Sequence, residues 1–259
     1  MSRNPSPDQE TRIYLQSRVV LRVEGMDAES FLQNIFTNDI KKIVDGYLQY
    51  NLLLSPQGQI LHDVFIFRRE ECFYVDVDRD RKEDLLRRLK IFKLRAQVII
   101  TETDMRVYAD ESGLDDPRLD DLPKRLYRLE NLPTHKDEQA YIDKSIQLGI
   151  PVTSAIRYEK DFAHDINLDT LNAIAWDKGC FIGQEVAARV HNRGLAKKRL
   201  YKVSADALIV GQSLQNEKGA VVGDIRVVDS TGTQALALIR KDSVTGILKT
   251  ESAESIAIA

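Results

Sequence analysis

Three strand-like stretches in residues 47–78 constrain the fold of this 259-residue chain more than any other feature. They read YLQYNLLLS, ILHDVFIFR and CFYVDVD, and the short turns PQG (residues 56–58) and REE (residues 69–71) separate them. Aromatic and β-branched runs between tight turns are typical of an antiparallel meander. The sequence therefore predicts an antiparallel sheet at the centre of the fold.

Helical patterns flank this meander on both sides in the sequence. Asp27 precedes apolar residues at helical spacing, and Asp80 with Glu83 three residues later resembles a capping box for a second helix. A third helix is predicted over residues 138–148, ending at Gly149. Helices laid on an antiparallel sheet define an α+β fold class.

The C-terminal part of the chain has a different pattern. After Gly194, short strand-like stretches alternate with glycine-containing turns, which predicts a small β-barrel. Residues 111–133 are acidic and contain prolines, so a surface connection is expected there. We predict residues 8–194 as one α+β region of two interleaved subdomains, and residues 195–259 as the barrel domain.

Composition excludes several classes of protein. Lys and Arg number 37 against 40 Asp and Glu, a net charge of −3, which argues against strong direct nucleic-acid binding. No apolar run approaches the roughly 20 residues of a membrane helix, and residues 1–12 form a polar tail without a signal sequence. Two cysteines fit a reducing compartment. A cytoplasmic location is expected.

The segment WDKGCFIGQE (residues 176–185) is the most distinctive stretch for chemistry. Cys180 lies between two glycines and just before a predicted helix that starts at Gln184, and Lys178 is two residues away. A helix N-terminus and a nearby ammonium group both favour a thiolate. Such a cysteine suits a metal ligand, a nucleophile or a redox thiol, and an inert packed cysteine is an equal alternative.

An ordered set of motifs resembles the YgfZ family, the iron–sulfur maturation branch of the folate-binding GcvT superfamily. The motifs run over most of the chain: FLQ with TND (residues 31–39), SPQG (55–58), GIP (149–151), INLD (166–169), KGCFIGQE (178–185) and ALALIR (235–240). The resemblance implies a GcvT-like fold and a bound tetrahydrofolate or derivative. It also implies Cys180 as the functional thiol, with Lys178 as its activator, and as a possible ligand of a shared iron–sulfur cluster.

The resemblance assigns folate-contacting positions as well. They are Asn51, Asp63, Gln147, Gly179, Gly183, Gln184, Glu185 and Arg189. Two positions depart from the glycine-cleavage aminomethyltransferases. His62-Asp63 stands where those enzymes carry paired aspartates, and Gln147 stands where they carry a pterin-binding glutamate. An amide hydrogen-bonds a pterin edge without balancing charge, so the transfer chemistry is expected to be lost while the pocket survives.

Three functions follow from these patterns. The first is a tetrahydrofolate-binding factor that uses Cys180 in assembly or repair of iron–sulfur clusters in client enzymes. One cysteine cannot complete a cluster's ligand set, so an A-type carrier or scaffold is the expected partner. The alternatives are an aminomethyltransferase and a folate-dependent factor that influences tRNA modification.

The remaining candidate groups are expected to be structural. The four histidines, His62, His135, His164 and His191, lack the spacing of a metal site, so surface or capping roles are expected. A basic strip over residues 189–199 is a solvated face by default, with folate's glutamate tail or an acidic partner as the alternative.

Overall fold

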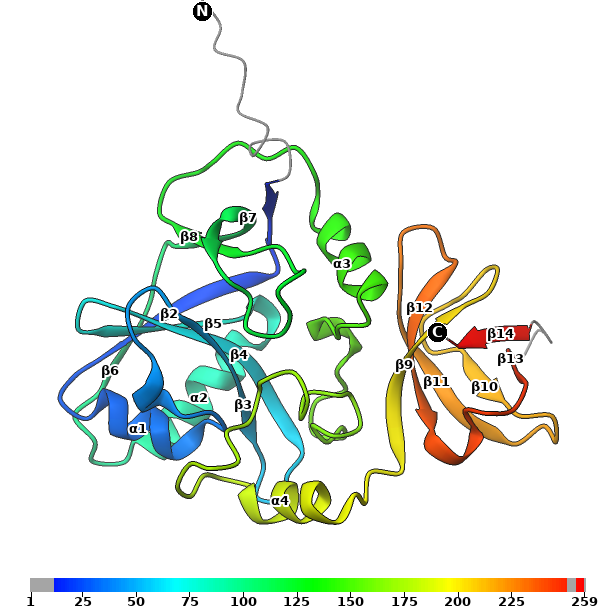
Figure 1. Ribbon diagram of the computed structural model, residues 1–259. Coiled ribbons are helices and arrows are strands. Elements are labelled where there is room, and N and C mark those ends of the chain that lie inside the picture. The colour runs from blue at the N-terminus through cyan, green and yellow to red at the C-terminus, as the bar shows by residue number, and fades with distance from the viewer. Residues whose placement is uncertain (1–11, 251–254, 259) are drawn as a thin grey trace, which may run out of the picture.

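The computed structural model describes residues 12–250 and 255–258 (Figure 1). The predicted polar tail and the predicted domain start at residue 8 lie outside these residues. None of the described helices has the length and apolarity that crossing a bilayer requires.

A five-stranded antiparallel sheet forms the centre of the larger part of the molecule. Its order is β3-β4-β5-β2-β6. The strands are β2 (Arg18–Glu24), β3 (Leu48–Leu54), β4 (Ile60–Arg69), β5 (Cys72–Asp78) and β6 (Ile99–Glu102). The predicted meander is confirmed as β3, β4 and β5, because each pairs with the next strand along the chain.

Two helices cover one face of this sheet, as the ribbon shows (Figure 1). They are α1 (Ala28–Ile35) and α2 (Lys82–Lys93), and both follow predicted helix starts. Phe31, Leu32 and Ile35 of α1 pack with Leu85 and Leu89 of α2 against alternate residues of the sheet. Asp27 precedes α1 but does not cap it, since its carboxylate instead accepts a hydrogen bond from the Gln97 backbone N–H at 2.7 Å.

A second sheet and a third helix face the opposite side. The second sheet has the order β1-β7-β8, with β1 (Ile13–Tyr14), β7 (Arg106–Leu114) and β8 (Arg125–Arg128). The helix is α3 (Glu138–Gln147). The surface connection expected over residues 111–133 is therefore wrong in part. This stretch contributes β8 and the buried side chains Asp116, Arg118 and Arg125.

The C-terminal strands close into a six-stranded barrel with the order β10-β11-β12-β9-β14-β13. The strands are β9 (Lys198–Ser204), β10 (Ser213–Gln215), β11 (Val221–Val228), β12 (Gln234–Arg240), β13 (Leu248–Thr250) and β14 (Ser255–Ile258). The α+β class and the appended barrel are confirmed. The division into domains at residues 194 and 195 stays a prediction, because the core around β3 and β4 continues into Leu200, Leu236 and Leu238 of the barrel.

Short helices complete the fold. The 3₁₀ helices are η2 (Ile40–Lys42), η3 (Arg79–Arg81), η4 (Thr153–Ala155) and η5 (Lys241–Ser243). Helix α4 (Gln184–Arg193) leads into β9 and the barrel (Figure 1). The predicted helix start at Gln184 is confirmed.

Candidate functional site

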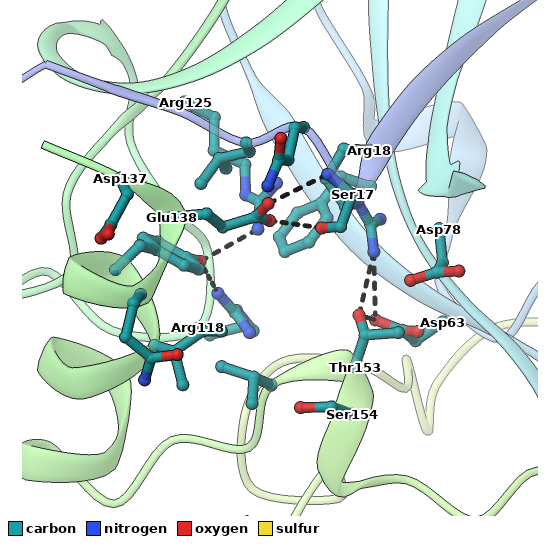
Figure 2. A pocket seen from close by; sticks show the side chains of 17 residues that line it. Ser17, Arg18, Asp63, Asp78, Arg118, Arg125, Asp137, Glu138, Thr153 and Ser154 are labelled. Carbon is teal, nitrogen blue, oxygen red and sulfur yellow. Dashed lines mark hydrogen bonds and ion pairs between the residues drawn. The ribbon is translucent and has the colours of Figure 1, made fainter. Parts of the chain in front are cut away.

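A cavity of about 350 Å³ opens between the central sheet and α3 (Figure 2). We call it the α3 cavity. Its lining comes from β2, β4, β5, β8, α3, η4 and the segments that connect them. It consists of Leu15, Gln16, Ser17, Arg18, Asp63, Phe65, Asp78, Arg118, Arg125, Asp137, Glu138, Gln139, Tyr141, Ile142, Val152, Thr153 and Ser154. Every lining residue precedes the barrel in sequence.

Asp76 organises one side of the buried wall behind this cavity. Its carboxylate accepts from Arg18 Nε at 2.6 Å, from Arg125 Nη1 at 3.0 Å and from the Tyr127 hydroxyl at 2.9 Å. Arg18 also donates to the Asp76 backbone carbonyl at 2.9 Å. A buried charge is tolerated when paired and fully hydrogen-bonded, so these contacts hold β2, β5 and β8 in one arrangement.

Asp116 organises the other side. Arg118 donates to both of its carboxylate oxygens, with Nε–Oδ1 at 2.9 Å and Nη2–Oδ2 at 2.8 Å. Arg118 and Arg125 also converge on the Tyr141 hydroxyl of α3, at 2.6 and 2.9 Å. The wall of the cavity is thereby tied to the helix that closes it.

Phe65 of β4 lies under the three buried arginines of the cavity wall. The guanidinium carbons of Arg125, Arg118 and Arg18 are 3.7, 4.9 and 5.6 Å from its ring centroid. A guanidinium over an aromatic face gains a cation–π contact and stays planar. The aromatic ring therefore fixes the orientation of the arginines between the two aspartates.

Asp63 projects into the cavity as a carboxylate with several partners. It accepts from the Tyr158 hydroxyl at 2.6 Å and the Tyr50 hydroxyl at 3.1 Å, and Arg18 Nη1 lies 3.9 Å away. Burial raises its pKa, but Arg18 and the Tyr158 hydroxyl outweigh burial and leave the pKa below its ordinary value. Asp63 is therefore a weak base at neutral pH and a strong hydrogen-bond acceptor.

Glu138 is a second carboxylate at the cavity, in the first turn of α3. It accepts from the Ser17 backbone N–H at 3.0 Å and from the Ser17 hydroxyl (Figure 2). Three arginines in the lining are matched by the buried Asp63, Asp76 and Asp116, while Glu138, Asp78 and Asp137 add negative charge. This balance favours a ligand edge rich in N–H donors over an anionic group.

His62 and Asp63 lie on opposite faces of the sheet, since successive strand residues alternate. His62 Nε2 is 2.9 Å from Asp84 Oδ2 of α2, whereas Asp63 faces the α3 cavity. From the sequence, His62 in place of an aspartate is expected to remove one carboxylate and with it the transfer chemistry. That interpretation needs correction, because a side chain at position 62 does not line the cavity.

Acidification is expected to destabilise the protein through His62. Burial and then Arg81 lower its pKa from 6.5 to about 4, against the opposing effect of Asp84. As the pH falls from 6.5 toward 4, the unfolded chain binds a proton that the folded chain excludes, so stability present above pH 6.5 is lost. The loss from this residue should reach about 2–3 kcal/mol.

Chemical denaturation of wild type and His62→Gln at about pH 7 and about pH 4.5 measures this loss. The variant should show the smaller pH dependence, with the exposed His135→Gln behaving as wild type. Identical pH dependence of wild type and His62→Gln would contradict the assignment.

The turn before α4 packs against the β3–β4 hairpin. Gly183 has a φ of +82°, and a Cβ at this position would lie 2.5 Å from the Ser55 carbonyl oxygen. Gly58 of the hairpin, with a φ of +83°, would similarly meet Val186 at 3.1 Å. The two glycines let the hairpin and the turn approach each other closely. The predicted role of Gly183 at a ligand stays untested, and its observed contact is with the chain itself.

Four other predicted positions in and after this turn face solvent, namely Gly179, Cys180, Glu185 and Arg189. Gly179 and Cys180 do not line the α3 cavity. Glu185 and Arg189 pair with each other across one turn of α4 at 2.9 Å. Cys72, the other cysteine, is buried, with Arg22 Nη2 donating to its sulfur at 3.2 Å. Cys180 is therefore the thiol that external molecules can reach.

Lys178 does not act as the predicted activator of Cys180. Its buried ammonium group donates to the backbone carbonyls of Gln33, Phe36 and Asn38 at 2.8, 2.7 and 2.8 Å. These contacts use all three of its N–H donors, at the end of α1 where helix carbonyls lack partners. Burial lowers the pKa of Lys178 to about 8. Lys178 therefore attaches the turn to the end of α1, and its ammonium group bonds to backbone carbonyls.

Two other predicted folate contacts are placed elsewhere. The Asn51 side chain is buried and bonds to the Asn38 backbone N–H at 2.9 Å and to Gln49 at 3.1 Å, so it supports the loop after α1. Gln147 is exposed at the last position of α3. Neither lines the α3 cavity, and Asp63 alone among the predicted contacts does.

Sequence reasoning missed the charged and hydroxyl residues that build the cavity. They are Ser17, Arg18, Asp76, Asp116, Arg118, Arg125, Glu138, Tyr141, Thr153 and Tyr158. Arginine and aspartate are mostly exposed in proteins, so a local pattern assigns them to the surface. The one usable signal was the short strand RLYR (residues 125–128) inside the acidic stretch.

The fold and the sequence were compared with known proteins. Residues 16–108 match the family model described as the GCVT N-terminal domain. The glycine cleavage system aminomethyltransferase T of Bartonella henselae superposes with a TM-score of 0.78 at 14% identity, covering 96% of this chain and 84% of that one. The fold is GcvT-like. The predicted GcvT-like fold is confirmed, and the YgfZ branch stays a prediction.

Sequence relatives of this GcvT-like chain are described as mitochondrial iron–sulfur cluster assembly factors IBA57. The Pyricularia oryzae homologue is 31% identical over 72% of this chain and 55% of its own length. The mouse and human proteins are 27% and 24% identical, each covering 95% of this chain and 82% of the relative. The chain spans about half the length of the fungal relatives. The cytoplasmic prediction is wrong, because these relatives are all described as mitochondrial.

Proposed function

We propose that this protein is a folate-binding accessory factor in the assembly or repair of iron–sulfur clusters. Similarity to assembly factors along 95% of the chain supports the cluster part. The α3 cavity in a GcvT-like fold supports the folate part. The observation that carries the proposal is the exposed Cys180 thiol on a turn that the Gly58–Gly183 contact and Lys178 hold in place.

Cys180 is the proposed protein ligand for iron. Thiolates are the usual ligands of iron–sulfur clusters, and one thiolate leaves the remaining positions to a partner. An A-type carrier or scaffold with its own cysteines is the proposed partner, and cluster-dependent enzymes are the clients. A shared cluster at Cys180 requires an accessible sulfur, and the exposure of this residue meets that requirement.

The α3 cavity is the proposed pterin site. Its volume lies within the range of small-molecule pockets. Glu138 and Asp63 present carboxylate oxygens to the N–H and amino groups of a pterin. Glu138 thus supplies the acid that the sequence interpretation found missing at Gln147.

Tetrahydrofolate is expected to raise the melting temperature of the wild-type protein, because a ligand that binds only the folded state stabilises it. Glu138→Gln should weaken binding at least about tenfold, as a charge-assisted hydrogen bond contributes about 1.5–3 kcal/mol. Glu185→Gln, on the exposed face of α4, is the matched control and should bind as wild type. Calorimetry gives both affinities. Weakened binding in Glu185→Gln but not in Glu138→Gln would place folate at the α4 turn. If wild type shows neither binding heat nor a thermal shift, the folate part of the proposal is wrong.

Cys180→Ser is expected to fold normally and to abolish support of cluster enzymes, since serine is a poor ligand for iron in sulfur clusters. Cys72→Ala, which removes the buried thiol, is the control. A cluster-dependent reporter enzyme is assayed in cells that carry each variant at equal protein level. Anaerobic reconstitution with an A-type carrier gives the cluster spectrum in vitro. Full reporter activity with Cys180→Ser would end the cluster-ligand proposal.

An aminomethyltransferase is the second candidate, and Asp63 in the cavity of a GcvT-like fold favours it. The low pKa of Asp63 limits its use as a base. One-carbon transfer to tetrahydrofolate, measured with wild type and Asp63→Asn, separates the two functions. Turnover by wild type that Asp63→Asn abolishes would favour the transferase.

A further inference from the structure

Three side chains able to hold a metal ion lie together outside the α3 cavity. Atoms of His164, Asp169 and His191 that can serve as ligands all lie within 4.8 Å of one another. His164 and Asp169 come from the loop before the signature segment, and His191 comes from α4. The proposed function uses none of the three. His164 is buried, so the surface or capping role expected for it is wrong, whereas His191 is exposed as expected.

His164 presents an unused nitrogen to this cluster. Its side chain is 3% exposed, and Nε2 has no hydrogen-bond partner among the described residues. The nearest carboxylate oxygen, Asp169 Oδ2, is 3.9 Å away, beyond hydrogen-bond distance. A buried nitrogen without a partner is costly in a folded protein, and a bound ion would satisfy it.

His191 closes the cluster from the solvent side. Its ring stacks on Trp176, with centroids 4.0 Å apart and an interplanar angle of 14°. The ring of His164 is 6.1 Å away. Stacking restrains the imidazole plane through its faces and leaves both ring nitrogens free to bind. Because His191 is exposed, an ion can enter from solvent.

Arg199 of β9 forms an ion pair with the carboxylate of Asp169. Its Nη1 and Nη2 atoms lie 2.5 and 2.9 Å from Oδ1 and Oδ2. Each carboxylate oxygen has a second lone pair, so Asp169 can bind a metal ion and Arg199 at the same time. The positive charges of the ion and of Arg199 would then repel each other. Arg199 therefore competes with a cation for Asp169.

We propose that His164, Asp169 and His191 bind one divalent first-row transition ion, with Arg199 as an internal competitor. Two imidazoles and one carboxylate with open positions suit Zn²⁺, Co²⁺ or Fe²⁺ and disfavour Ca²⁺ and Mg²⁺, which prefer oxygen ligands. An ion at this site links the loop of His164 and Asp169 to α4. The proposal is independent of folate binding and of Cys180.

The test titrates the full chain, freed of metal with a chelator, with Co²⁺ and separately with Zn²⁺. Calorimetry should give one ion per chain, and the visible Co²⁺ spectrum should show nitrogen and oxygen ligation. His191→Ala, an exposed change that leaves the core intact, should weaken binding at least about tenfold. Arg199→Ala should tighten binding by removing the competing cation. His135→Ala, another exposed histidine, is the matched control and should bind as wild type.

Two further variants keep the outcome decisive. His164→Gln should lose binding, and its circular dichroism shows whether it is folded. Cys180→Ser should bind as wild type. Wild-type affinity in His191→Ala would overturn the proposal, and so would a thiolate–Co²⁺ charge-transfer band that disappears in Cys180→Ser.

Discussion

Asp76→Ala is expected to lower the free energy of unfolding by about 3–5 kcal/mol, because removal of one partner leaves buried charge uncompensated. Asp76 is fully buried and accepts from Arg18, Arg125 and the Tyr127 hydroxyl. Two guanidinium groups would then remain in the wall of the α3 cavity without their carboxylate. The loss arises from desolvated charge and is therefore much larger than that of a surface ion pair.

Equilibrium denaturation of wild type and Asp76→Ala measures this effect. The matched control is Asp242→Ala, which breaks the exposed pair with Arg240 at 2.6 Å and should change stability far less, because water screens an exposed ion pair. Tetrahydrofolate binding by any folded Asp76→Ala protein should also weaken, since Arg18 and Arg125 line the cavity. A stability loss equal to that of Asp242→Ala would show that the buried network does not stabilise the fold.

Gly183→Ala is expected to lower the free energy of unfolding by about 2–4 kcal/mol, because a strained φ and a steric clash combine. The residue has a φ of +82°, and its Cβ would meet the Ser55 carbonyl oxygen at 2.5 Å and Leu54 Cβ at 2.9 Å. Both neighbours belong to the β3–β4 segment, so the start of α4 must move away from the hairpin. Support of cluster enzymes should fall with it, as the Cys180 turn shares this attachment.

Two other glycines separate the causes of this effect. Gly149 has a φ of +73° but open space around its Cβ, so Gly149→Ala measures the conformational cost alone. Gly179 has neither a positive φ nor an atom within 4 Å, so Gly179→Ala should be neutral within about 0.5 kcal/mol. The expected order of destabilisation is Gly183, Gly149, Gly179. A neutral Gly183→Ala would show that the hairpin does not hold the turn.

Local patterns predicted the elements of the fold well. The meander of β3, β4 and β5, helices α1, α2 and α3, and the C-terminal strands all follow from hydrophobic periodicity and turn residues. The start of α4 at Gln184 was also predictable, since a glycine precedes a helical pattern there. These features depend on neighbours within a few residues, which is the range over which backbone preference and amphipathic spacing act.

The candidate site depended on contacts between distant residues. Asp63 was identified and does line the α3 cavity, but Glu138, Arg118 and Arg125 appeared as ordinary surface charges. Lys178 looked like a neighbour of Cys180 in sequence, yet its ammonium group reaches carbonyls more than 139 positions away. Spacing along the chain does not tell which way a long side chain points.

The sequence by itself therefore determined the α+β class, the closing barrel and the distinctive cysteine turn, because periodicity and turn chemistry are local properties. Only the tertiary structure decided that Asp63 faces a cavity, and that three arginines and three aspartates are buried around that cavity. It also decided that His164, Asp169 and His191 meet. A charged side chain is buried without a large cost only when it contacts partners from other segments of the chain, and a local sequence pattern does not show which segments meet.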